Sequence, residues 1–107
     1  MTTTTSTVIE LIVEERQRQI TEEGWTTEHD DEHVDGELAD AAACYAMNVR
    51  TRLVLSWRSN ILRSVWPKSW TLNWWKPSSD NRIRDLVKAG ALIVAEIERL
   101  QRQETKD

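Results

Sequence analysis

Residues 22–33, EEGWTTEHDDEH, hold the side chains of this chain that are best suited to chemistry. Imidazole and carboxylate groups suit zinc, manganese, iron or nickel, and a four-residue spacing places two histidines on one face of a helix. Gly24 and Gly36 favour a loop instead, in which that geometry is lost. A metal site and an ordinary loop held by turns and backbone hydrogen bonds both remain open. The candidate ligands are His29, Asp30, Asp31 and His33.

A second chemically useful group lies in residues 56–81, which contain five of the six tryptophans and both prolines. Indole faces stack on nucleobases, whereas Arg and Lys pair with phosphates, so this combination predicts a surface for a nucleotide or a single strand. The alternative is that the tryptophans are core or dimer contacts. The basic and tryptophan residues of this segment also include Trp57 and Lys68, and the candidate binding residues among them are Arg58, Arg63, Trp66, Trp70, Trp74, Trp75 and Lys76.

Charge divides the chain into two halves. Residues 9–40 contain twelve acidic and two basic residues, whereas residues 41–88 contain nine basic and two acidic residues. The acidic half disfavours a long nucleic acid, because it would repel a phosphate backbone running past it. A short nucleotide meets no such objection.

Helical periodicity and caps predict the elements that position these groups. The first helix runs from Val8 to Thr21, with Thr7 as its N-cap and Glu10 completing a capping box. Val8, Ile9, Ile12, Val13 and Ile20 recur at helical spacing, which supports this helix. A second helix opens at Asp35 or Gly36.

The third predicted helix is the most regular element. Its apolar residues between Ile83 and Leu100 keep a period near 3.5 to 3.6, and Asp80 precedes it as a cap. Gly90 and Ala91 are expected to face the alanines at 41–42, since small residues allow two helices to approach closely. The prolines of residues 56–81 forbid a long helix there, which predicts a loop with short turns.

The sequence therefore predicts a small all-α fold, a three-helix domain with a long Trp-rich loop between helices two and three. One domain is expected over residues 7–104, after a disordered stretch 1–6, because 107 residues sustain one core but not two. Cys44 is expected to be a buried thiol. No apolar run approaches the roughly 18 residues that cross a bilayer, and no signal peptide is apparent, so the cytoplasm is the expected location.

The segment GELADAAACYA contains an E-x-x-D pair, Glu37 and Asp40, and the first predicted helix carries Glu14. This resembles MazG-type nucleotide pyrophosphohydrolases, in which an E-x-x-E helix and an E-x-x-D helix hold Mg²⁺ against a nucleoside triphosphate. The resemblance implies that Glu14, Glu37 and Asp40 are metal ligands of a Mg²⁺-dependent enzyme. The second carboxylate of the first motif is missing, because Gln17 and Arg18 stand at that spacing.

Three segments together resemble a small accessory protein of tailed phages and prophages of proteobacteria: ERQRQITEEGWTTEHDDEH, GELADAAACYA and WWKPSSDNRIRDLVKAGALIVAEIERL. The order Gly24, Trp25, Asp30, Asp31 and His33, followed by DLVKAGALI, more distantly resembles ryanodine-receptor repeat (RyR) domains. The His-Pro that follows the acidic pair in that family is absent here. The first resemblance implies a viral accessory gene, and the second implies a helical module that binds nucleotide-derived ligands.

The resulting prediction is a phage nucleotide-binding protein that sequesters a nucleotide-derived signal and so counters host antiphage defence. The acidic loop would lie beside the Trp-rich segment, with Trp25 stacking on or beneath the base. Asp30, Asp31 and His33 would bond to ribose hydroxyls or the base edge. The cations expected to neutralise phosphate are Arg58, Arg63 and Lys76. Binding of this kind needs no cofactor and no catalytic group.

Two alternatives of other classes remain open. One is the Mg²⁺-dependent MazG-like nucleoside triphosphate pyrophosphohydrolase. The other is an acidic inhibitor that binds a host defence protein by mimicking the phosphate array of DNA with residues 9–40. A homodimer is expected in addition, because it would ease the shortage of buried surface in so short a chain.

Overall fold

Four helices make up the regular structure of the described residues. The computed structural model describes residues 5–47, 65–68, 70, 75–78 and 80–106. Its helices are α1 (Thr5–Thr21), α2 (Thr27–Asp30), α3 (Glu37–Ala46) and α6 (Arg82–Lys106), and these described residues contain no β-strand. The predicted all-α class with three substantial helices is confirmed. The addition is α2, a single turn within the segment expected to be a loop.

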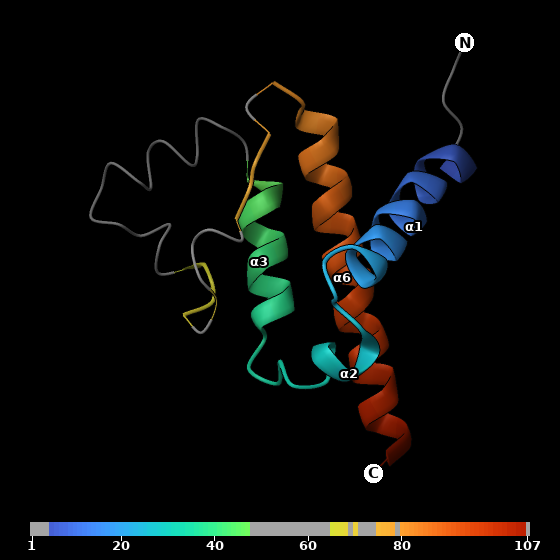
Figure 1. The fold of residues 1–107 in the computed structure, drawn as a ribbon, viewed down its shortest axis with the longest axis vertical. Coiled ribbons are helices and arrows are strands. Elements are labelled where there is room, and N and C mark those ends of the chain that lie inside the picture. The colour runs from blue at the N-terminus through green and yellow to red at the C-terminus, as the bar shows by residue number, and fades with distance from the viewer. Residues whose placement is uncertain (1–4, 48–64, 69, 71–74, 79, 107) are drawn as a thin grey trace.

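α6 is the helix against which the other three pack. Figure 1 shows α3 and α6 side by side and antiparallel, while α1 crosses α6 at a steep angle and its N-terminal end points away from the other helices. The short α2 lies between the ends of α1 and α3, next to α6 (Figure 1). No described helix combines the length and the apolar character needed to cross a bilayer.

The core lies between α3 and α6 and is closed by tryptophans. Alanines on both helices are fully buried, which lets the two backbones approach closely, and Cys44 is a buried thiol as expected. Trp66 and Trp70 then fill the volume beside these small residues. The core consists of Leu38, Ala41, Ala42, Cys44, Tyr45, Trp66, Trp70, Ala89, Leu92 and Ala95.

The helix starts differ in part from the predicted caps. Thr7 is not an N-cap, because α1 already begins at Thr5. Asp80 is not the cap of α6 either, since the side-chain oxygen of Asn81 accepts the hydrogen bond from the Arg84 N–H at 3.1 Å. Gly36, which has the left-handed φ of 84°, precedes α3 within the range predicted for its start.

Gly90 does not face α3, contrary to the prediction. A Cβ added at this position would lie 2.9 Å from the Cδ1 atom of Ile12 on α1, so the glycine marks the point where α1 crosses α6. The contact of α6 with α3 is made by Ala89, Leu92 and Ala95 instead. The neighbouring small residues Ala89 and Gly90 of α6 thus contact two different helices, α3 and α1.

The buried face of α1 is polar, although apolar residues at helical spacing predicted the helix. Glu15, Arg16 and Gln19 are the buried residues of this helix. Its large apolar side chains remain exposed, and these are Val8, Ile9, Leu11 and Val13. A polar face of this kind can be buried only where each charged group meets a partner.

Candidate ligand-binding site

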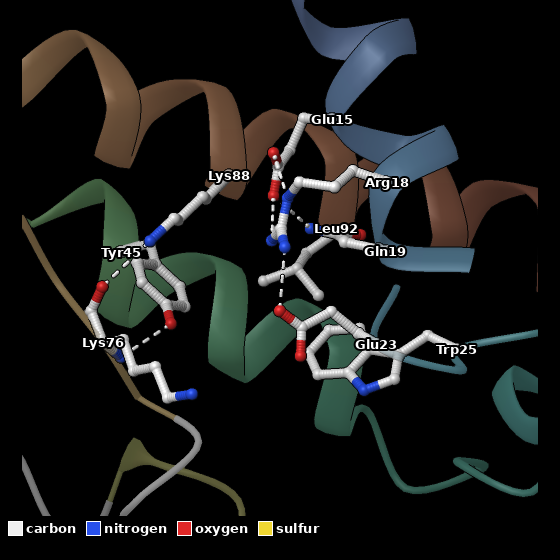
Figure 2. Close-up of a pocket in the computed structure, with 9 residues that line it drawn as sticks. All are labelled: Glu15, Arg18, Gln19, Glu23, Trp25, Tyr45, Lys76, Lys88 and Leu92. Atoms are coloured by element: carbon white, nitrogen blue, oxygen red, sulfur yellow. Dashed lines mark hydrogen bonds and ion pairs between the residues drawn. The ribbon is translucent and has the colours of Figure 1, made fainter. Parts of the chain in front are cut away.

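A pocket of about 150 Å³ opens between α1, α3 and α6 and is called the central pocket below. Figure 2 shows its lining, with Tyr45, Lys76 and Lys88 on one side, Glu15 and Arg18 opposite them, and Glu23 and Trp25 at the edge. The described residues that line it are Glu15, Arg18, Gln19, Glu23, Trp25, Tyr45, Lys76, Lys88 and Leu92.

An ion-pair network forms the α1 side of the pocket. Arg18 binds Glu15 through two hydrogen bonds, Nε to Oε1 at 2.9 Å and Nη2 to Oε2 at 2.8 Å. Its remaining Nη1 donates to Oε1 of Glu23 at 2.9 Å. The guanidinium of Arg18 is therefore held in one orientation, with one carboxylate on each side of it.

Glu15 is the buried anion that organises this side. Its carboxylate is almost wholly buried and also accepts a hydrogen bond from Nη1 of Arg84 at 2.6 Å. Burial alone would raise the pKa of Glu15, but hydrogen bonds from Arg18 and Arg84 outweigh it and hold the pKa below its ordinary value. Glu15 is therefore ionised at neutral pH and fixes two arginines, one on α1 and one on α6.

Two lysines form the opposite side of the pocket. The Lys88 ammonium donates to the backbone oxygen of Lys76 at 2.9 Å and lies 5.5 Å from the centre of the Tyr45 ring. The Tyr45 hydroxyl accepts a hydrogen bond from the backbone N–H of Lys76 at 2.8 Å. The backbone of Lys76 is thus clamped to both α3 and α6.

Within the described part of the chain no carboxylate forms an ion pair with Lys76 or Lys88, although Asp85 and Glu15 act on Lys88 from farther away. Burial lowers the pKa of Lys88, and the neighbouring Arg84 lowers it further. The side chain of Lys76 is exposed. The pocket thus combines two unpaired ammonium groups with an arginine already bound to carboxylates, which suits an anionic guest.

Trp25 joins the pocket to the aromatic core. Gly24, with φ 73°, turns the chain after α1, and the Trp25 N–H donates to the Gln19 backbone oxygen at 3.0 Å. The Trp25 ring lies 5.3 Å from the ring of Trp70 at 60°. Trp70 lies in turn 5.6 Å from Trp66, which stacks on Trp75 at 5.8 Å. Trp25, which forms part of the pocket wall, is thus the last of four tryptophans whose indole rings contact one another in series.

Asp30 of the predicted acidic loop holds α2 against α1. Its carboxylate is fully buried and binds Nη2 of Arg16 at 2.5 Å. Burial raises the pKa of Asp30, with Arg16 opposing that effect. Arg16 also pairs with Glu98 of α6 at 3.3 Å, so this one guanidinium connects α1, α2 and α6.

The other three predicted loop ligands also contact the fold, although Nδ1 of His29 and Nε2 of His33 are buried without a hydrogen-bond partner in the described structure. Asp31 binds Arg102 of α6, with Oδ1 2.7 Å from Nη2. His33 lies 3.4 Å from Glu37 through Nδ1, and its ring packs 4.7 Å from the ring of His29 and 5.1 Å from that of Trp70. None of the four predicted loop ligands lines the central pocket, whereas Trp25 does.

The predicted residues of the Trp-rich segment divide into three groups. Lys76 lines the central pocket. Trp66 and Trp70 are buried in the core, and Trp75 packs against it half-buried. Arg58, Arg63 and Trp74 lie outside the described residues.

The carboxylates of the MazG-like alternative lie in separate places. Glu14 lines a groove between α1 and α6, whereas Glu37 and Asp40 line a recess beside residues 65–68. Within the described residues, no three His, Cys, Asp or Glu side chains are grouped closely enough to hold a metal ion. Glu37 instead accepts a hydrogen bond from the Asp35 N–H at 2.6 Å and contacts His33.

Sequence analysis did not identify seven of the nine described pocket residues, which are Glu15, Arg18, Gln19, Glu23, Tyr45, Lys88 and Leu92. Arg18 was noticed only because it interrupts a carboxylate motif. Lys88 could have been identified as a site residue from the sequence, because it is the cation of an otherwise apolar stretch, VKAGALIV, in a helix predicted to be buried. Comparisons with protein-family models, with curated proteins and with solved structures give no match for this chain.

Proposed function

We propose that this protein binds a small phosphate-bearing ligand of the nucleotide class in the central pocket. The observation that carries the proposal is the meeting of Trp25, from the acidic loop, with Lys76, from the Trp-rich segment, in one pocket. These two segments were expected to form one site, and each contributes one expected residue to it. Lys88 of α6 supplies the second cation.

The charges support an anionic ligand. Lys76 and Lys88 line the pocket without carboxylate partners, and an ammonium group is a strong partner for phosphate oxygens. Arg18 is held by Glu15 and Glu23, and a phosphate could take the place of the more exposed Glu23 carboxylate. The ligand would then bind three cations.

Two further features of the pocket support a ligand that has an aromatic end with hydrogen-bond donors. The indole of Trp25 offers a stacking surface, and Leu92 an apolar contact. The side-chain oxygen of Gln19 is buried without a hydrogen-bond partner in the described structure, and such an acceptor suits an amino or N–H group of a base. A volume of about 150 Å³ is below the roughly 300 Å³ of ordinary ligand pockets, so the ligand would enter with one end.

The biological use proposed is the sequestration of a nucleotide-derived signal of host antiphage defence. This part of the proposal comes from the resemblance of the sequence to phage accessory proteins and RyR domains, because a ligand class does not by itself define a pathway. Binding without turnover fits a pocket in which the two carboxylates of the described lining, Glu15 and Glu23, are both bound by arginine.

The test begins with mass spectrometry of small molecules released by heat from the purified protein. Isothermal titration then follows with ADP, ATP, cyclic dinucleotides and ADP-ribose, and with adenosine and inorganic phosphate as partial ligands. We expect a nucleotide to bind, and Lys76→Ala to weaken binding about tenfold, which corresponds to ~1.4 kcal/mol. Lys68→Ala is the matched control, because Lys68 is exposed and lines a different recess.

Three results would overturn the proposal. Absence of binding to every member of the panel is the first, and equal loss of affinity in the Lys76 and Lys68 variants is the second. The third is conversion of ATP to AMP and pyrophosphate in the presence of Mg²⁺, which would establish the MazG-like enzyme instead. If the panel is silent, the exposed carboxylates of Glu22, Glu28 and Glu32 make a basic protein partner the next candidate.

A further inference from the structure

α1 exposes most of its apolar side chains. Val8, Ile9, Leu11 and Val13 are 40 to 61% exposed, and at 100° per residue they form one apolar face of α1, roughly 200° wide, opposite Glu10 and Glu14. An apolar helix face of this width is normally buried. Ile12, the remaining apolar residue between positions 8 and 13, packs on Gly90 of α6.

α6 exposes a second apolar surface. Its large aliphatic residues outside the core are 44 to 68% exposed, and they follow one another at alternating intervals of three and four residues once Gly90 is included. This is the a/d spacing by which helices pair, with Ile at two a positions and Leu at two d positions. The outer stripe consists of Ile83, Leu86, Ile93, Ile97 and Leu100.

The two exposed surfaces meet where α1 crosses α6. At the crossing, Gly90 lets Ile12 sit directly on the α6 backbone. On one side, α1 and α6 diverge and leave a groove of about 360 Å³, to which Leu11, Ile83 and Val87 contribute apolar walls. Figure 1 shows the N-terminal part of α1 projecting away from the other helices.

We infer that a second copy of this chain covers both surfaces, with the first three turns of α1 and the outer stripe of α6 forming a two-fold interface. In such an interface α1 of one protomer packs on the outer stripe of its partner, and the reverse contact follows by symmetry. Each of the nine exposed side chains presents roughly 60–100 Å² to solvent, so together they approach the ~800 Å² per partner of a standard interface.

Charge favours a second copy over a membrane surface. The exposed charges beside the apolar residues of α1 are the carboxylates Glu10 and Glu14, which would be repelled by anionic lipid headgroups. The α6 surface carries Arg84, and the Glu15–Arg84 pair at 2.6 Å shows that the two helices already match in charge within one chain. Arg84 is still 35% exposed, so the exposed Glu10 or Glu14 on α1 of the partner protomer can approach it in the dimer.

Sedimentation equilibrium of the full chain, from low micromolar to submillimolar concentration, tests this inference. We expect a reversible monomer–dimer equilibrium. Ile97→Glu should raise the dissociation constant by about 30- to 100-fold, as expected for a charge placed at the centre of an apolar interface. Val34→Glu is the matched control, because Val34 is 63% exposed but lies on neither helix, and it should leave the equilibrium unchanged.

The inference is overturned if the wild-type chain is a monomer throughout this concentration range. It is also overturned if Ile97→Glu, folded by circular dichroism, dimerises as the wild type does, or if the protein binds vesicles of anionic phospholipid instead. The wild-type measurement does not depend on the folding of any variant. The result is separate from nucleotide binding, because none of the nine exposed apolar side chains of the proposed interface lines the central pocket.

Discussion

At the scale of single residues, buried ions orient the groups that face the central pocket. Glu15 receives hydrogen bonds from Arg18 and Arg84, and this fixes the Arg18 guanidinium at the pocket edge. Beneath α2, Arg16 likewise forms ion pairs with two acidic residues, Asp30 and Glu98. Removing one member of such a pair leaves the other without its partner, and this cost exceeds the net stabilisation that the intact pair provides.

The stability of the protein should depend on the ionisation of Glu15. Because its pKa is lowered in the folded state, its contribution is complete above the unfolded pKa of about 4.3 and is lost as the pH falls through the folded pKa. Glu15→Gln should lower the free energy of unfolding by roughly 2 kcal/mol at pH 7, since both arginines are partly exposed. Urea unfolding at a series of pH values measures the difference. A difference that does not shrink below pH ~4 would contradict this account.

The affinity of the central pocket for anions should rise when Glu23 is neutralised. Glu23→Gln removes the carboxylate that competes with a ligand for Nη1 of Arg18, and we expect about three- to tenfold tighter binding of the nucleotide. Glu22→Gln is the control, because Glu22 lies farther from Arg18, at 3.5 Å, and does not line the pocket. Isothermal titration of the two variants tests this expectation. Equal affinities would show that Glu23 does not compete with the ligand for Arg18.

At the scale of elements, the end of α3 depends on a residue of α6. The guanidinium of Arg82 donates to the backbone oxygens of Tyr45, Ala46 and Met47, which are the carbonyls that a helix end leaves without partners. One side chain thus closes α3 and fixes the start of α6 beside it.

Arg82→Ala should therefore destabilise the fold by about 1.5–3 kcal/mol, the usual range for hydrogen bonds to a charged group. Hydrogen exchange should accelerate first at the C-terminal turn of α3, ahead of the centre of α6. Lys68→Ala should change neither quantity, because Lys68 is exposed. Uniform acceleration of exchange in both helices would indicate a global effect and contradict the capping role.

The crossing of α1 over α6 can be tested at Gly90. Alanine is favoured over glycine by about 1 kcal/mol within a helix, but the added Cβ would lie 2.9 Å from Cδ1 of Ile12. Gly90→Ala should consequently be close to neutral alone and stabilising by about 1 kcal/mol in an Ile12→Val background, which lacks that atom. Thermal unfolding of the four proteins of this cycle gives the coupling, and additive effects would show that the two residues do not touch.

The sequence predicted the helices better than their faces. The period of Ile83 to Leu100 identified α6 correctly, but the same period did not reveal that this stripe lies outside and that Ala89, Leu92 and Ala95 form the buried side. The polar buried face of α1 was also unpredictable, because the partners of Arg16 lie 14 and 82 residues away along the chain. Trp25 and Lys76 were predicted from residue chemistry, whereas Lys88 joins them only through the packing of α6.

At the scale of the whole molecule, the proposed dimer links stability to concentration. Because the dimer binds only folded chains, mass action should raise the melting temperature by about 3–5 °C for each tenfold rise in protein concentration. Ile97→Glu should abolish this dependence, and Val34→Glu should retain it. Calorimetry over two decades of concentration measures both, and a melting temperature independent of concentration would contradict a dimer of useful affinity.

The position of α6 at the centre of the fold has a consequence for how freely its sequence can vary. Ala89 and its neighbours face α3, Gly90 faces α1, Lys88 faces the pocket, and Ile93 and Ile97 face the proposed partner. No side of this helix is then neutral to substitution. In a library of single substitutions selected for function, α6 should tolerate far fewer changes than exposed residues such as Glu28 and Glu32, and the intolerant positions should recur without a helical period.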